Sequence, residues 1–516
     1  MTAPPQPSSL PKSLFPADYR AAGVLLHVTS LPSRFGIGDF GPQARTWIDW
    51  LHDAGQSWWQ VLPLGPIGRG HSPYSSLSSF AGNWLLISPD DLVHDGLLQA
   101  GEVTPRSFPE HAVDFEAVIA YKNELLAKVW ANVQSGAGGG ELTSAYEQFC
   151  HDSSHWLDDF AMFSVLRDRH GEHYLKWPSE LVHRDRHALA QVAQELAKEI
   201  DQVRLAQFLV FRQTDRLKAY AHGKGVRLIG DLPYFVCADS SDVWANPELF
   251  LLDQQRRPSF VAGVPPDYFS ADGQLWGNPV YDWSALRGTG YRWYIDRLRA
   301  LLDQADLIRL DHFRGFAAAW HVPAGAPTAL NGQWVTGPGA EFFHALQSDL
   351  GSLPVIAEDL GLITPDVIEL RDAFDIPGTR VLQFAFDGME DNPYLPENYV
   401  HNTVAFTGTH DNNTTRGWFD SLGEAEQESV RVALSIPEGD GVSVAGEMLR
   451  QVWSSSAALA MAPLQDLLGL GEDARMNVPG TPEGNWCWRT TSEMLSASAA
   501  QRLRELTEES GRLISA

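Results

Sequence analysis

The stretch that decides the fold is LIRLDHF at residues 307–313, a short apolar run with an acid and a histidine near its end. Runs this short that stay apolar on both faces are typical of buried parallel strands. Seven other runs share this form: 23–31 (GVLLHVTSL), 58–64 (WWQVLPL), 226–235 (VRLIGDLPYF), 353–361 (LPVIAEDLG), 379–386 (TRVLQFAF), 403–411 (TVAFTGTHD) and 457–464 (AALAMAPL).

Helical patterns separate these runs. Residues 41–54 and 291–304 both carry an apolar stripe at helical spacing. Alternating strands and helices predict a parallel sheet with right-handed crossovers, and eight strands favour an α/β fold of the closed (β/α)8 TIM-barrel type. An open doubly wound sheet is the alternative. Its dinucleotide-binding form is disfavoured, because no glycine-rich phosphate fingerprint follows the first run.

The spacing of the runs predicts two insertions in a single catalytic barrel spanning residues 1–516. The segment between the second and third runs is far longer than a crossover needs, and 115–133, 145–169 and 187–222 look helical. We therefore expect a mostly helical insertion at about 84–205. A second insertion, at about 238–286, is rich in Pro, Gly and aromatic residues and is expected to be a long ordered loop over the C-terminal face.

Composition excludes several classes of function. Lys and Arg number 38 against 65 Asp and Glu, so the net charge of −27 disfavours nucleic acid and membrane surfaces as partners. No apolar stretch approaches 18 residues, and the Pro-rich start lacks the apolar core of a signal peptide, which predicts a cytoplasmic protein. Three scattered cysteines fit neither a disulfide framework nor a cysteine metal site.

Charged residues gather where the apolar runs end. Barrel enzymes keep their chemistry at the C-terminal ends of their strands, so these side chains should converge on one mouth. A single acid there is more often a structural ion pair, but acids at four strand ends indicate a functional site. The residues are Asp231, Arg309, Asp311, Glu358, Asp359, His410 and Asp411.

Such a cluster could bind a divalent metal or perform general acid–base chemistry. Arg309, His312 and His410 crowd the same ends, and they suit polar hydroxyl or carboxylate groups better than a metal ion. Two carboxylates flanking an acetal carbon are what glycoside chemistry requires. A divalent-metal barrel hydrolase stays an alternative at this point.

Long motifs, in order, then identify a resemblance. They are WQVLPLGP, SPYSSLSSFAGN, GDLPYFV, GVPPDYFSADGQLWGNPVYDW, IRLDHFRGF, AEDLG, TGTHDNNTTRGW and RMNVPGT. Over nearly its whole length the chain resembles the 4-α-glucanotransferases called amylomaltase or disproportionating enzyme, in the α-amylase-like barrel clan. The resemblance implies retaining transfer of α-1,4-glucan segments between glucans or maltooligosaccharides, cyclisation of long glucans, no cofactor and no metal.

The resemblance also implies roles for single residues. Asp311 matches the nucleophile, Glu358 the general acid/base and Asp411 the third acid, which stabilises the transition state. The implied substrate-binding residues are Tyr74 (stacking at the cleavage point), Asp231, Arg309 beside the nucleophile, His410 in the donor subsite, and Trp276 and Asn278 in a loop that covers the glucan.

Residue chemistry fits these roles. Arg309 supplies a cation that keeps Asp311 ionised, and the pKa of Glu358 should be raised by nearby carboxylates so that it can donate a proton. A retaining mechanism predicts that the carboxyl groups of Asp311 and Glu358 lie about 5–5.5 Å apart.

Two questions stay open from the sequence. Residues 69–71 (RGH) stand where relatives should have an aromatic residue and an acid, so the sequence does not decide whether an accessory glucan site exists there. His71 either bonds a sugar hydroxyl or belongs to a solvated loop. A plain retaining α-glucan hydrolase and a non-catalytic glucan-binding protein are the alternative functions, and the intact acid triad argues against the latter.

Overall fold

The computed structural model describes residues 14–171, 173–266, 271–481 and 483–514. Its centre is an eight-stranded sheet in which all paired strands are parallel, in the order β10-β11-β12-β1-β2-β3-β6-β9. Each of the eight apolar runs contributes one strand: β1 (Ala21–Leu25), β2 (Trp58–Gln60), β3 (Arg227–Leu232), β6 (Leu307–Leu310), β9 (Val355–Ala357), β10 (Gly378–Val381), β11 (Thr403–Phe406) and β12 (Leu459–Pro463).

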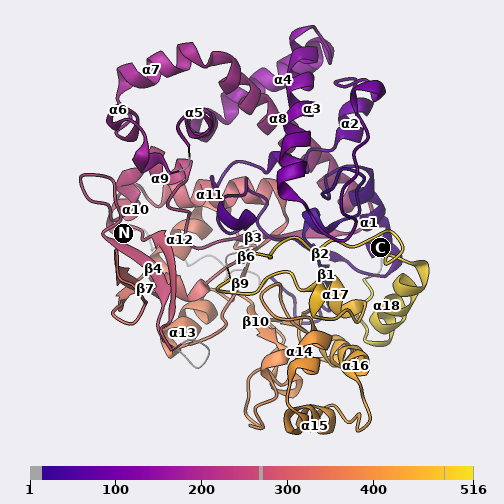
Figure 1. Ribbon diagram of the computed structural model, residues 1–516. Helices are drawn as coiled ribbons and strands as arrows, with labels where there is room; N and C mark the ends of the chain where they lie inside the picture. Colours follow the sequence, from indigo (N-terminus) through magenta and orange to yellow (C-terminus); the bar gives the residue numbers. More distant parts are fainter. Residues whose placement is uncertain (1–13, 172, 267–270, 482, 515–516) are drawn as a thin grey trace, which may run out of the picture.

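The two edge strands of this sheet meet. The backbone N–H of Ala357 on β9 donates to the carbonyl of Pro377 just before β10 at 2.8 Å, and the hydroxyl of Thr379 donates to the carbonyl of Ala357. Closure confirms the TIM barrel and rejects the open sheet. Figure 1 shows the strands at the centre of the molecule with helices around them.

Side chains from every strand fill the barrel interior. Trp58, Ile229, Leu307, Ile356, Val381, Val404 and Met461 form one buried cluster. The outer faces of the strands pack against helices such as α1 (Pro42–Asp53) and α11 (Arg292–Gln304), whose apolar stripes are buried. Burial on both faces explains why these strands are continuously apolar.

The last described part of the chain is anchored at the N-terminal end of the barrel. Helix α18 (Ala497–Glu509) leads to Arg512, which is fully buried. Its guanidinium donates to the carbonyls of Ala21 at 3.0 Å, Ser455 at 2.9 Å and Trp453 at 2.5 Å. Desolvation lowers the pKa of Arg512 to about 9.

Helices occupy the first insertion, in the upper part of Figure 1. They are α2 (Pro89–His94), α3 (Phe115–Gln134), α4 (Gly139–Asp152), α5 (Ser154–His170), α6 (Ser179–Val182), α7 (Arg186–Glu195) and α8 (Ala197–Gly223). The helix expected over 145–169 is divided at Ser153, and that over 187–222 at Leu196. At both residues the backbone leaves the helical conformation, which an apolar pattern alone does not reveal.

The second insertion differs from its expected loop structure. It contains β4 (Phe260–Val264) and β5 (Gln274–Pro279), which pair antiparallel. With β7 (Ala318–Pro323) and β8 (Gln333–Thr336) they form a second sheet in the order β5-β4-β7-β8. Glycine and proline residues obscure the strand pattern in this part of the sequence. In addition, β4 pairs with β7, which follows β6 in the sequence, so this pairing cannot be read from the insertion alone.

Two remaining expectations concern the membrane and the cysteines. Across the described ranges, no helix combines the length and the apolar character needed to cross a membrane. Cys150, Cys237 and Cys487 are all free thiols.

Candidate active site

The ends of β3 and β6 bring Asp231, Arg309 and Asp311 together. Asp231 and Arg309 are register partners on these adjacent strands. The Arg309 guanidinium donates to both carboxylate oxygens of Asp231 at 2.9 Å and lies 3.0 Å from Oδ1 of Asp311. Asp231 and Arg309 are buried, whereas Asp311 is partly exposed at the mouth. One guanidinium therefore bridges two carboxylates, and only one of these is open to a ligand.

Tyr74 connects this ion-pair cluster to His410. Its hydroxyl donates to Oδ2 of Asp231 at 2.6 Å, and its ring stacks on that of His410, with centroids 5.2 Å apart. Burial raises the pKa of Tyr74 well above its usual value, so the hydroxyl keeps its proton. Trp486, which is buried, contacts both rings.

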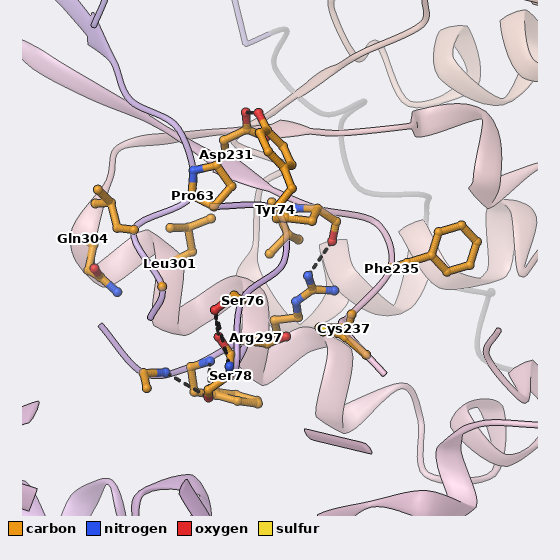
Figure 2. Close-up of a pocket in the computed structure, with 18 residues that line it drawn as sticks. Pro63, Tyr74, Ser76, Ser78, Asp231, Phe235, Cys237, Arg297, Leu301 and Gln304 are labelled. Atoms are coloured by element: carbon orange, nitrogen blue, oxygen red, sulfur yellow. Dashed lines mark hydrogen bonds between the residues drawn. The ribbon is translucent and has the colours of Figure 1, made fainter. Parts of the chain in front are cut away.

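Figure 2 shows Tyr74 and Asp231 side by side at the edge of a cavity of about 50 Å³. Arg297, also buried, reaches from α11 to donate to the carbonyls of Pro233 and Tyr234. It thereby fixes the backbone that follows β3, and with it the position of Asp231.

Glu358 directly follows β9. Its Oε2 accepts from the backbone N–H of His312 at 2.7 Å, and its Oε1 from that of Leu360 at 3.0 Å. Desolvation raises the pKa of Glu358 to about 7, the negative charge of Asp311 adds to this, and Arg309 opposes it. The direction agrees with the expectation from sequence, but burial is the main cause rather than the neighbouring carboxylates.

Its neighbour Asp359 has a different role. Asp359 is buried and accepts from Arg371 at 2.5 Å and from the backbone N–H of Thr379 at 2.7 Å. These contacts tie the end of β9 to β10 and α13 (Pro365–Ala373). In the motif AEDLG, Glu358 therefore lies at the mouth of the barrel, whereas Asp359 holds the segment after β9 in place.

Asp411 and His410 follow β11. Asp411 is about half exposed, and its Oδ1 accepts from Nδ2 of Asn477 at 2.6 Å. Arg475 donates to the backbone carbonyl of Asp411 at 2.9 Å. The late motif RMNVPGT therefore contacts the third acid directly. Asn477 and Arg475 were not among the expected site residues, although both lie inside that motif.

Strand β5 carries Trp276 and Asn278. Trp276 is 39% exposed. Its ring packs edge-to-face with that of His312, and the ring centroids are 4.9 Å apart. Asn278 donates to the carbonyl of Val236 at 2.8 Å, which joins β5 to the segment after β3. Tyr268 and Phe269, which belong to the same motif as Trp276 and Asn278, lie outside the described residues. His71 stacks on Phe115 with centroids 4.4 Å apart, so packing accounts for its ring.

All nine expected site residues thus lie on segments that meet at one end of the barrel. The arrangement offers a partly exposed carboxyl group held by an arginine, a second carboxyl whose pKa is raised to about 7, and an exposed third acid. Within the described parts of the chain, no three His, Cys, Asp or Glu side chains are grouped as metal ligands. Such a site can supply a nucleophile and a proton donor.

Comparisons with known proteins agree with this chemistry. A family model described as 4-alpha-glucanotransferase matches residues 26–495. The chain is 47% identical over 502 residues to a 4-alpha-glucanotransferase of Synechocystis sp., covering 96% of this chain and 99% of the relative. It is 44% identical over 500 residues to that of Thermus thermophilus, with the same coverage.

A solved structure gives the same result. The amylomaltase from Streptococcus agalactiae in complex with acarbose superposes with a TM-score of 0.91 at 35% identity, over 96% of this chain and 99% of that one. From the matched family model, the near full-length relatives and the shared structure, we conclude that the chain belongs to the 4-alpha-glucanotransferase family, enzymes that transfer segments of α-glucans.

Proposed function

We propose that the chain transfers α-1,4-glucan segments by double displacement with retention of configuration at C1. The ion pair between Arg309 and Asp311, beside a Glu358 whose pKa is raised to about 7, is the observation that supports this. An ionised nucleophile and a protonated acid can then coexist near neutral pH.

In the first step an oxygen of Asp311 forms a bond to C1 of the donor glucan. The bond from C1 to the glycosidic oxygen breaks, and that oxygen takes the proton of Glu358 as the leaving glucan departs. In the second step the 4-OH of an acceptor attacks C1 and gives its proton to Glu358, while the bond from C1 to Asp311 breaks and the carboxylate of Asp311 is released. A long glucan can supply its own acceptor end, which would give a cyclic product.

The other residues would bind the sugar at the reacting centre. Asp411 and His410 would hold hydroxyl groups, Tyr74 would stack on the ring, and Asp231 would fix Arg309 and Tyr74. Trp276 and Asn278 would belong to the cover over the glucan, within the proposed insertion at about 238–286. We propose that this cover and the helical insertion at about 84–205 are parts of one catalytic unit.

Transfer requires that a bound acceptor competes with water. With water at ~55 M and a glucan at millimolar concentration, the acceptor must be favoured by ~10⁴-fold, or ~5.5 kcal/mol. Stacking and hydroxyl hydrogen bonds can supply this if the cleft also excludes ordered water. The contact of Asn477 with Asp411 and the half-exposed Trp276 support a site with such a cover.

Incubation with maltotriose tests the proposal. Transfer should give glucose and a ladder of longer maltooligosaccharides, with little rise in reducing ends. Slowing the second step should also allow mass spectrometry to find a covalent sugar on Asp311. Reducing ends that rise in step with substrate loss would favour a hydrolase, and a label on another acid would reject Asp311 as the nucleophile.

A further inference from the structure

One buried carboxylate holds both ends of the segment that carries Asp411. Asp466, on α17 (Leu464–Leu467) directly after β12, is 3% exposed. Its Oδ2 accepts from the hydroxyl of Thr407 at 2.6 Å and from that of Thr415 at 2.7 Å. Its Oδ1 accepts from the backbone N–H of Thr415, also at 2.7 Å. In the sequence Asp411 lies midway between these two threonines.

The surroundings of Asp466 supply hydrogen-bond donors but no cation. Thr407 directly follows β11 and Thr415 is the first residue of α14 (Thr415–Ser421); both are fully buried. Among the described residues, no charged side chain offsets the burial that raises the pKa of Asp466, and only the bonds from the two threonines oppose it. A buried carboxylate without a cation depends on such donors, because an unpaired one is costly to bury. The carboxylate therefore ties the two threonines together.

The segment is also held from its other side, by Gln383. This buried side chain follows β10, and its Nε2 donates to the carbonyl of Asn413 at 3.0 Å. Strands β10, β11 and β12 are neighbours in the barrel, so the strands on both sides of β11 each supply one buried polar side chain to the segment after it. Within the segment, Oδ1 of Asn412 accepts from the backbone N–H and the hydroxyl of Thr409, both at 2.9 Å. Side chains, rather than a regular helix or strand, thus hold this segment.

We propose that Asp466 is a positioning residue for the reaction: through the two threonines it fixes the backbone from which His410 and Asp411 reach the mouth. The side chain of Asp411 is about half exposed, so its place depends on the backbone that carries it. A displacement of about 1 Å at a reacting centre can cost ~10²-fold in rate. This kinetic consequence rests on the proposed function, whereas the hold on the segment does not.

The variants D466A and D466N test the proposal as a pair. The amide oxygen of D466N can accept from the backbone N–H of Thr415, and its NH₂ group can donate to both hydroxyls, so the three contacts survive without the charge. D466A loses all three. We expect kcat, measured as consumption of maltotriose, to fall ~10²-fold in D466A and to stay within about three-fold of the wild type in D466N. Normal activity in D466A, or an equal loss in both variants, would overturn the proposal.

The threonine side gives a second test, which decides even if D466A does not fold. T407V removes one hydroxyl and keeps the shape of the side chain, whereas T407S keeps the hydroxyl. T507V is the control: Thr507 on α18 is fully buried, and its hydroxyl accepts from Gln56 at 2.8 Å and from Trp453 at 3.1 Å. T407V and T507V should both lower the melting temperature, but only T407V should lower kcat, by about ten-fold. Equal kcat in T407V and T407S would contradict the proposal.

Two further measurements separate local positioning from general loosening and from the proposed function. Amide hydrogen exchange, followed by mass spectrometry, should be faster over residues 407–415 in D466A than in D466N or the wild type, and this needs no catalysis. The alkaline decline of kcat/KM should keep its position in D466A, because Glu358 is held by the backbone of His312 and Leu360. Unchanged exchange, or a shifted decline, would contradict the role of Asp466. Faster exchange together with an active D411N would contradict only the proposed role of Asp411.

Discussion

Two buried arginines at opposite ends of the barrel are held in different ways. Arg309, at the C-terminal end, bridges the carboxylates of Asp231 and Asp311. Arg512, at the N-terminal end, donates to three backbone carbonyls and makes no ion pair within the described ranges. Burial opposes the charge of both, but neighbouring carboxylates raise the pKa of Arg309 whereas that of Arg512 falls to about 9.

This difference in partners indicates that Arg309 serves catalysis and that Arg512 serves stability. A cation between two carboxylates sets the charge of a group that can react, because one of those carboxylates is open to ligand. A cation among carbonyls only satisfies backbone acceptors where the first and last parts of the chain meet. Changes at the mouth should therefore alter rates with little effect on folding, and changes at the base should do the reverse.

The largest effect is expected for D311N. Loss of the nucleophile should reduce kcat by at least ~10³-fold with maltotriose, while glucan binding survives. The melting temperature should stay the same or rise, since Arg309 keeps Asp231 and a carboxylate near Glu358 is removed. Product analysis and thermal unfolding measure both. Near-normal turnover would remove Asp311 from the mechanism.

E358Q should come next, because it leaves the nucleophile but removes the proton donor. Activity on maltotriose should fall by ~10²–10⁴-fold. Glycosylation by a substrate with an activated leaving group, which needs no proton, should fall much less, as single-turnover kinetics would show. Equal losses on both substrates would argue against the acid/base role.

At the base, R512M should remove the buried hydrogen bonds from Arg512 to three backbone carbonyls. We expect a loss of about 3 kcal/mol in the free energy of unfolding, measured by urea denaturation, with normal kcat in the folded fraction. Arg504→Met, on α18 just before this segment, removes a partly exposed pair with Glu508 and a long hydrogen bond to the carbonyl of Asp53, and should cost under about 1 kcal/mol. Equal costs for both variants would contradict the anchoring role of Arg512.

The pH dependence of kcat/KM should report the protonation of Glu358 at the mouth of the barrel. Glycosylation needs protonated Glu358, so kcat/KM should fall about tenfold per pH unit above about 7, and an activated leaving group should abolish this alkaline decline. Folding raises the pKa of Glu358, so its contribution to stability is complete below about pH 4.5 and lost as pH rises through about 7. An alkaline decline that persists with the activated substrate would assign it to another group.

W276A should have the smallest effect. It tests whether the cover over the glucan, rather than the acids at the mouth, controls the access of water. A less complete cover should admit water, so the ratio of hydrolysis to transfer on maltotriose should rise a few-fold with little change in stability. L275A is the matched control, because adjacent residues of β5 point to opposite faces of the sheet. A similar rise in both variants would indicate general loosening of the strand.

Much of the barrel and its mouth could be predicted from sequence, since both depend on local patterns. A short run such as LIRLDHF is apolar because both faces of its strand are buried, and an acid at its end lies at the mouth because parallel strands share one C-terminal end. The ion pair between Arg309 and Asp311 follows from residues only two positions apart.

Tertiary structure alone decided the rest. The second sheet joins strands on either side of β6, Asn477 reaches Asp411 across 66 positions, and Arg512 bonds a carbonyl 491 positions away. Burial, which raises the pKa of Glu358, depends on everything packed around a residue. The sequence by itself determined which chemical groups stand at the strand ends. Their protonation and their partners depended on the fold, because desolvation and hydrogen bonding act through space and not along the chain.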